Sequence, residues 1–129
     1  MREIEFRGRS VVTGEWLYGS LIQAIPQGAV VIYDDNQVIH EVDSETVGQF
    51  TGVKDDKNGN KIFEKDIVHT VGVIPGVTVD DIGIVKFIDG SYIVESMNGN
   101  DGWELFQEGA EIEIIGNTSD NSELLEVER

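Results

Sequence analysis

The sequence predicts an all-β fold, either a small, strongly bent antiparallel sheet or a barrel. Short segments rich in β-branched and aromatic residues recur roughly every ten residues, with turn residues between them. Two of the turns carry the dipeptides Asn58-Gly59 and Asp89-Gly90, which are typical of two-residue hairpin loops because these residue types tolerate positive φ. A chain of 129 residues has room for one hydrophobic core, so we expect a single domain over residues 1–129.

The first half of the chain predicts one strand followed by one hairpin. Residues 15–25 form the strand, and the Pro-Gln-Gly sequence of residues 26–28 ends it. Residues 29–33 are a continuous apolar run of the buried-strand type. The Asp-Asp-Asn sequence that follows predicts a turn into residues 37–42, which completes the hairpin.

The second half predicts two more hairpins. Residues 46–53 and 61–71 flank the Asn58-Gly59 turn, whereas residues 73–81 contain Pro75 and Gly76 and predict a loop. Residues 82–88 and 91–97 then pair around Asp89-Gly90. These predictions give a sheet built from sequence neighbours.

The end of the chain predicts one more strand and a short helical turn. Residues 111–116 form the strand, and Asn121 or Ser122 caps a helical turn that extends to Glu126. Residues 65–68, followed by residues 83–87 and the Asp89 turn, are similar to consecutive strands of SH3-like barrels, in which an acidic residue before the strand commonly fixes a turn. That similarity concerns the fold and predicts no function.

The net charge of −16, from 25 acidic and nine basic residues, argues against nucleic acid as a partner. Affinity for nucleic acids comes largely from Lys and Arg that replace condensed counterions. Lys54, Lys57, Lys61 and Lys65 do cluster around the Asn58 turn, but we interpret them as a solvated hairpin tip in which Lys offsets Asp55 and Asp56.

The composition also limits the cellular setting. The chain has no cysteine, which excludes disulfides, thiolate nucleophiles and cysteine-based metal sites. The first residues alternate charged and apolar side chains and do not form a signal peptide. No apolar run approaches the roughly 20 residues of a membrane span. We therefore expect a soluble, cytoplasmic protein that does not contact a membrane.

No catalytic, metal or cofactor site is predicted. His40 lies beside Glu41 and Asp43 in sequence, but strand alternation places His40 on the opposite face from both acids. The loop that begins at Asp56 lacks the Gly and Glu spacing of a calcium loop, because Lys61 is its sixth residue. The acidic pairs 34–35 and 80–81 offer cation ligands at loop tips, although turn formation explains them as well.

The aromatic residues have two interpretations. They form either a recognition surface or part of the core, and for Trp16 and Tyr18, which share one strand face, we favour the core. The glycines do not form a phosphate-binding loop, which leaves nucleotide binding without support. The aromatic residues considered are Trp16, Tyr18, Phe50, Tyr92, Trp103 and Phe106.

Three segments carry a resemblance to a known family. Residues 46–68, TVGQFTGVKDDKNGNKIFEKDIV, resemble the ETVGQFTG, KDKNGK and IYEGDIV pattern of the YopX-like family of small phage and prophage proteins. Residues 111–125, EIEIIGNTSDNSELL, are similar to the family's EVIGNIYENPELL, and residues 1–8 are similar to its opening. The resemblance implies a YopX-like β domain in a bacterial host cytoplasm, without an assigned biochemical activity.

The sequence departs from the family pattern at several positions. Lys65 replaces the Gly of the EGD triplet, Ser122 replaces Pro, and Thr118 and Ser119 replace an apolar and aromatic pair. The presence of Lys65 predicts that the backbone at this position does not adopt positive φ, because glycine alone adopts positive φ without cost.

Three functions from different classes are compatible with the sequence. We favour a non-catalytic accessory protein that binds a protein partner, or a second copy of itself, through an acidic or edge-strand surface. The first alternative is an acidic mimic that blocks a nucleic-acid-binding protein, which requires carboxylates at phosphate-like spacing on one face. The second is a metal-dependent enzyme that uses Glu64, Asp66 and Glu95, which requires these carboxylates to converge.

Overall fold

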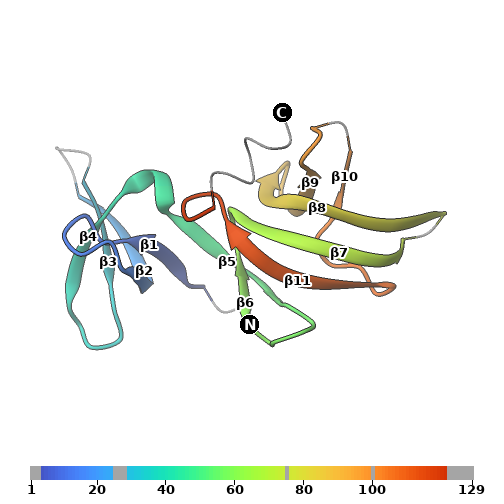
Figure 1. The fold of residues 1–129 in the computed structure, drawn as a ribbon. Helices are drawn as coiled ribbons and strands as arrows, with labels where there is room; N and C mark the ends of the chain where they lie inside the picture. Colours follow the sequence, from blue (N-terminus) through green and yellow to red (C-terminus); the bar gives the residue numbers. More distant parts are fainter. Residues whose placement is uncertain (1–3, 25–28, 75, 100, 122–129) are drawn as a thin grey trace. The chain divides into compact units, whose positions relative to one another are not determined.

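The computed structural model describes residues 4–24, 29–74, 76–99 and 101–121, and its fold confirms the all-β prediction (Figure 1). These residues form eleven strands and a single 3-10 turn. In the same ranges, no helix has the length and apolar character needed to cross a membrane. The helical turn predicted near Glu126 lies outside the described residues.

The chain divides into two compact units, Met1–Gly52 and Val53–Arg129. We describe each unit by itself. The prediction of one domain concerns cooperative folding and stays a prediction.

The strands of the first unit pair in the order β4-β3-β2-β1-β5, as part of a six-stranded sheet that β6 (Lys61–Phe63) completes. Strand β5 (Gly48–Lys54) continues into the second unit. The 29–33 and 37–42 hairpin prediction is confirmed by the pairing of β3 with β4. A single bridge between Ser10 and Val42 links the end of β1 to β4. The other strands are β1 (Phe6–Arg9), β2 (Trp16–Ala24), β3 (Ala29–Tyr33) and β4 (Ile39–Val42).

Alternate residues of these strands make the core of the first unit. Val30, Ile32 and Val42 are buried, and Leu17, Leu21 and Val47 pack against them. A short 3-10 helix, η1 (Ser44–Thr46), follows β4, and the Asp43 carboxylate caps it by accepting the N–H of Glu45. The period of two that predicts strands therefore also selects which residues are buried here.

The second unit contains a five-stranded antiparallel sheet in the order β10-β9-β8-β7-β11. The two ends of this sheet are different strands, so among the described residues the sheet is open and the barrel alternative is wrong. The strands of this unit are β6 (Lys61–Phe63), β7 (Asp66–Ile74), β8 (Val77–Ile88), β9 (Ser91–Ser96), β10 (Gly102–Glu104) and β11 (Ala110–Asn117).

The core of the second unit lies on one face of this sheet. Six buried residues form it, and Tyr92, Trp103 and Ile114 are among the half-buried residues that pack against it. The buried residues come from β6, β7, β8, β9, the segment after β10, and β11: Ile62, Val68, Val85, Val94, Leu105 and Ile112.

The loop predicted over residues 73–81 is wrong. Strands β7 and β8 stay paired until Ile74 lies opposite Val77, so the connection consists of Pro75 and Gly76 alone. Gly76 has a φ of 85°, which permits so short a connection. Pro75 and Gly76 predicted a break in the chain, but they did not indicate how short that break is.

The two hairpin dipeptides behave differently. Asp89 and Gly90 both have positive φ, 51° and 85°, and join β8 directly to β9, which confirms the two-residue loop. Gly59 has a φ of 71°, but the loop spans residues 55–60 and Asn58 is not at positive φ, so the two-residue loop predicted there is wrong. The longer loop closes through the N–H of Asp55, which donates to the carbonyl of Asn60 over 2.8 Å.

Asp55 explains the longer loop. Its side chain is buried, and one carboxylate oxygen accepts the N–H groups of Asn58 and Asn60 at 3.1 and 2.9 Å. The other oxygen accepts the N–H of Ile114 on β11 at 3.3 Å. Asp55 is therefore a structural residue, and its charge is not offset by the hairpin lysines; Lys57 instead lies 3.7 Å from Glu113.

The expectation about Lys65 is also wrong. Lys65 has a φ of 75°, so the β6–β7 turn keeps a left-handed residue without a glycine. The backbone there is fixed from three sides. Asp66 accepts the N–H of Phe63 at 2.8 Å, the N–H of Lys65 donates to Val85, and the carbonyl of Lys65 accepts from Thr118. These contacts hold Lys65 in a conformation that its side chain disfavours.

Substitution of Lys65 by glycine is expected to stabilise the protein by about 0.5–1 kcal/mol, because glycine removes the cost of positive φ. The measurement is the urea midpoint of unfolding. Lys61→Gly is the control, since Lys61 lies within β6, where glycine weakens a strand. A lower midpoint for Lys65→Gly would show that side-chain contacts of Lys65 outweigh the backbone strain.

Candidate binding pocket

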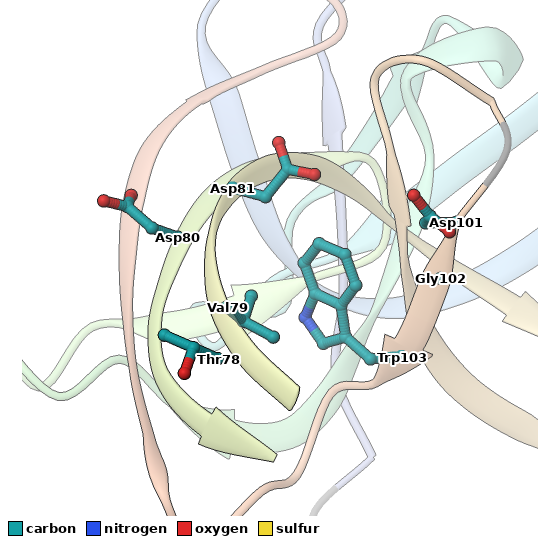
Figure 2. A pocket seen from close by; sticks show the side chains of 7 residues that line it. All are labelled: Thr78, Val79, Asp80, Asp81, Asp101, Gly102 and Trp103. Atoms are coloured by element: carbon teal, nitrogen blue, oxygen red, sulfur yellow. The ribbon is translucent and has the colours of Figure 1, made fainter. Parts of the chain in front are cut away.

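The second unit contains an open pocket of about 400 Å³ between the first half of β8 and the start of β10 (Figure 2). Its walls combine an indole ring with three aspartates, and among the described residues the lining includes no lysine or arginine. The lining residues are Thr78, Val79, Asp80, Asp81, Asp101, Gly102 and Trp103.

Trp103 forms the apolar wall of the pocket. It lies opposite Val94 in the β9–β10 register and packs against the core of the second unit. Its indole N–H donates to the hydroxyl of Thr70 at 3.3 Å. Figure 2 shows the ring beside Val79, with Asp81 and Asp101 beyond its six-membered end. The ring is therefore held in place by packing and by a hydrogen bond.

Asp81 is positioned by a close approach of β8 and β9. Gly83 lies opposite Ser96, and a Cβ at Gly83 would come within 2.5 Å of the carbonyl oxygen of Glu95. Glycine thus lets the two strands close, and the hydroxyl of Ser96 donates to Asp81 at 2.8 Å. The second carboxylate oxygen of Asp81 accepts the N–H of Ile82, also at 2.8 Å. This carboxylate is fixed by two donors.

The other two aspartates differ in orientation. The Asp80 carboxylate points away from the indole in Figure 2 and lies 2.7 Å from Nε2 of His69, on the other face of the sheet. Asp101 is exposed, and its backbone carbonyl accepts the N–H of Ser96 at 2.8 Å. Negative charge inside the pocket therefore comes mainly from Asp81 and Asp101. Carboxylates next to an aromatic ring suit a cationic group.

The Asp80-Asp81 pair was predicted at a loop tip, which is wrong because both residues lie within β8. Alternation along the strand sends their side chains to opposite faces of the sheet. The pair therefore does not act as one cation site. The sequence did show these acids and the aromatic Trp103, but no local signal indicates that residues 20 or more positions apart meet at one pocket.

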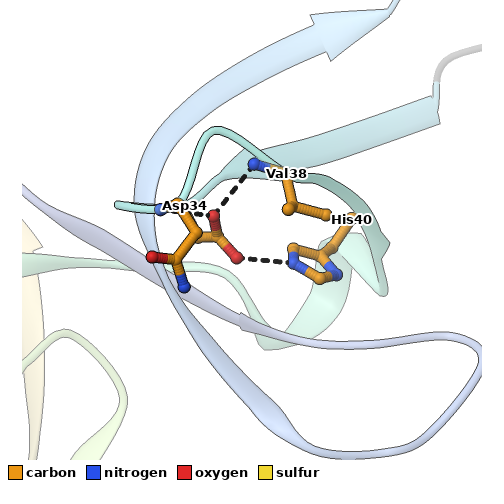
Figure 3. Close-up of polar contacts among 4 residues, drawn as sticks. Asp34, Val38 and His40 are labelled. Atoms are coloured by element: carbon orange, nitrogen blue, oxygen red, sulfur yellow. Dashed lines mark hydrogen bonds and ion pairs between the residues drawn. The ribbon is translucent and has the colours of Figure 1, made fainter.

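The turn interpretation of the Asp34-Asp35 pair is confirmed. One Asp34 oxygen accepts the N–H groups of Asn36 and Val38 at 2.9 and 3.0 Å, and the other lies 2.8 Å from Nε2 of His40 (Figure 3). The Val38 N–H, followed by the His40 contact, lowers the pKa of Asp34 below its ordinary value. His40 thus contacts a carboxylate from the preceding turn, not its sequence neighbours Glu41 and Asp43.

The carboxylates considered for a metal-dependent enzyme have structural contacts. Asp66 is buried and accepts the N–H of Phe63, and Glu95 lies 2.5 Å from the amine of Lys86. Glu64 is half-buried in the turn before β7. Over the described ranges, no group of three or more His, Asp or Glu side chains is placed to hold a metal ion.

The aromatic residues divide between core and surface. Phe50 is buried, and Tyr92 and Trp103 are half-buried against the core, whereas Phe106 is 68% exposed. The core assignment is wrong for Tyr18, which is 44% exposed because it lies on the strand face opposite the core residues of β2.

Trp16 is half-buried beneath arginine side chains of β1. The guanidinium carbons of Arg7 and Arg9 lie 4.7 and 5.9 Å from the ring centroid. Cation–π contacts of this kind stabilise an aromatic ring at a sheet surface. Trp16 is therefore not a core residue, and its ring is covered by arginine side chains and does not form an open recognition surface.

Many of the acidic side chains have a structural role in the fold. At least six aspartates accept main-chain N–H groups, which reduces the carboxylates that remain for a row of phosphate-like charges. These residues are Asp34, Asp43, Asp55, Asp56, Asp66 and Asp81.

Fold and pocket together describe a small all-β protein with an acidic, tryptophan-lined pocket. The family model described as YopX protein matches residues 5–126, and the chain belongs to this family. This finding confirms the resemblance in the sequence. No curated protein matches the chain.

Two solved structures are similar to the chain over nearly its whole length. Protein yopX from Bacillus subtilis is 23% identical with a TM-score of 0.58, and the alignment covers 96% of this chain and 98% of that one. Protein EF1440 from Enterococcus faecalis is 19% identical with a TM-score of 0.50, and the alignment covers 97% of this chain and 99% of that one. At these identities the similarity shows the fold alone.

Proposed function

We propose that the chain is a non-catalytic phage or prophage accessory protein that binds a basic protein partner, with a lysine or arginine side chain of the partner in the Trp103 pocket. The observation that carries the proposal is the combination of a fixed indole ring with the carboxylates of Asp81 and Asp101 in a cavity of about 400 Å³. The cavity is large enough for a side chain of this length.

The electrostatics favour such a partner. A chain with a net charge of −16 attracts a basic surface over long range, and the attraction weakens as salt screens it. A cation that enters the pocket meets opposite charge, and no lysine or arginine competes with it among the lining residues that the structure describes. Nucleic acid meets repulsion from the same field. Belonging to the YopX family supports the phage or prophage setting.

The test is a pulldown from lysogenic bacterial cells with the wild-type protein and Asp101→Lys. Asp101 is exposed, so the charge reversal leaves the fold intact and is expected to weaken partner binding at least about tenfold. The matched control is Glu104→Lys, an equal charge reversal three residues further along the chain, at an exposed residue of β10 outside the pocket lining. A salt series and a gel-shift assay with DNA and RNA accompany the pulldown.

The expected result is a protein retained by the wild type and by Glu104→Lys, lost by Asp101→Lys and released by salt. If all three proteins retained the partner equally, the pocket would not be its binding site. A DNA or RNA shift at physiological salt, with no protein partner recovered, would contradict the proposed function itself.

A further inference from the structure

The pocket beside Trp103 lies where β8 lacks a neighbouring strand on one side. Strand β8 begins at Val77, but its pairing with β9 ends where Gly83 lies opposite Ser96. The N–H of Gly99 donates to the carbonyl of Ser96 at 2.9 Å, which turns the chain away from the line of β9. Among the described strands, the first half of β8 is therefore paired with β7 alone.

The hydrogen bonds at this boundary show which main-chain groups of β8 face the empty side. The N–H of Met97 donates to the carbonyl of Ile82 at 3.1 Å, so the main-chain groups of Ile82 point toward β9. This direction alternates along a strand, so those of Asp80 and Thr78 point to the same side, beyond the end of β9. Within the part of the chain that the structure describes, no hydrogen bond is made to them there.

This unpaired edge of β8 forms one wall of the pocket. Thr78 and Asp80 line the pocket although their side chains point away from the indole in Figure 2, so they contribute their main chain. The carboxylate of Asp81 accepts the N–H of Ile82 at 2.8 Å and so satisfies the last donor before the unpaired stretch. The opposite wall is the start of β10, with Trp103. An edge of this kind is a template for a further strand.

We propose that an extended segment of the basic partner adds to this edge of β8 and continues the line of β9, antiparallel to β8 as β7 and β9 are. Two residues of the segment exchange main-chain hydrogen bonds with Thr78 and Asp80, and the residue between them lies opposite Val79. Directly opposite side chains share one face of a sheet, so this central side chain lies on the face of Val79, beside Trp103. It is the lysine or arginine of the proposed function, on which the inference rests.

Charge decides that the occupant is a basic segment. Asp81 and Asp101 lie beyond the six-membered end of the indole, on the side that receives the central side chain (Figure 2). Asp80 places a further carboxylate on the opposite face of the same strand. A segment of this acidic chain, or of any acidic protein, would meet repulsion at each of these positions.

The test uses a capped peptide of alternating valine and threonine residues with a central lysine as the probe, and calorimetry and NMR hydrogen exchange as the measurements. In the free protein, the N–H groups of Val79 and Asp81 are expected to exchange slowly, because they face β7, whereas those of Thr78 and Asp80 exchange fast. A saturating peptide is expected to slow the exchange of Thr78 and Asp80 at least about tenfold.

Matched peptides and matched variants isolate the main-chain contacts. Methylation of the two peptide nitrogens that flank the lysine removes the donors that face β8 and is expected to weaken binding at least about tenfold. Methylation of the lysine main-chain nitrogen, which faces away from β8, is the control. Thr78→Pro removes an N–H that does not pair with β7 and is expected to weaken binding similarly, whereas Thr78→Ala keeps that N–H and is expected to bind as the wild type does.

Strand addition would be overturned if both methylated peptides bound equally well, or if the wild type did not bind the lysine peptide. This peptide comparison needs no protein variant, so it decides the question even if Thr78→Pro fails to fold. A peptide with norleucine in place of lysine separates the inference from the proposed function. If it bound as tightly as the lysine peptide and flanking methylation still weakened it, the added strand would be supported and the cation in the pocket would be contradicted.

Discussion

Replacement of Asp66 by alanine is expected to lower the free energy of unfolding by about 3 kcal/mol, a large part of the stability of a small protein. The side chain is 1% exposed, and its carboxylate accepts the N–H of Phe63 at 2.8 Å. Alanine leaves that buried N–H without its acceptor. It also releases the turn in which Lys65 is held at a φ of 75°.

Urea denaturation at pH 7 measures the effect, with Asp35→Ala as the control because Asp35 is an exposed aspartate in a turn. Asp66→Asn separates the hydrogen bond from the charge, since the amide oxygen still accepts from Phe63, and is expected to cost less than alanine. Equal and small losses for Asp66→Ala and Asp35→Ala would mean that the carboxylate does not hold the turn.

Asp66 also illustrates what the sequence could predict. The similarity to SH3-like barrels predicts that an acidic residue fixes a turn before the strand, and Asp66 has that role through its contact with Phe63. The Asp89-Gly90 loop was predicted equally well, because both residues adopt positive φ without help from the rest of the fold. Local chemistry decides such features.

Other features depend on contacts between distant residues and were missed. Asn58-Gly59 has the same local preference as Asp89-Gly90, but the Asp55 carboxylate binds the loop and Ile114, a residue 59 positions away, and produces a longer turn. Lys65 adopts positive φ because its backbone is bound to Val85 and Thr118. The pocket also depends on contacts between distant residues, since Trp103 donates a hydrogen bond to Thr70, which is 33 positions away in the sequence.

The distribution of the acids connects fold and function. Asp34, Asp55 and Asp66 serve as acceptors for main-chain N–H groups, so mutations there are expected to affect stability first. Asp101 lies just before β10 and Glu104 lies within it, and both are exposed. Charge-reversal experiments can therefore separate recognition from folding, provided that they avoid the structural aspartates.

The second large effect is expected at Asp55, where alanine should cost about 3 kcal/mol. Three main-chain N–H groups lose their acceptor: those of Asn58 and Asn60 in the loop and that of Ile114 on β11. The last contact joins the loop to β11. Thermal and urea unfolding measure the change, and Asp35→Ala again reports the cost of removing an exposed aspartate.

Asp55 further predicts how stability depends on pH. Burial raises the pKa of its carboxyl, but the N–H groups of Asn60, Ile114 and Asn58 outweigh burial and lower the pKa below the ordinary value of 3.8. A lowered pKa in the folded state contributes stability above the unfolded pKa of about 3.9, and this contribution is lost as pH falls through the folded value. Asp55→Asn removes the titrating group, so its loss of stability relative to the wild type is expected to be largest near pH 7 and to shrink below about pH 4. A stability difference that stays constant between pH 7 and the acid range would show that the charge of Asp55 does not stabilise the loop, because only the ionised carboxylate can lose its advantage on protonation.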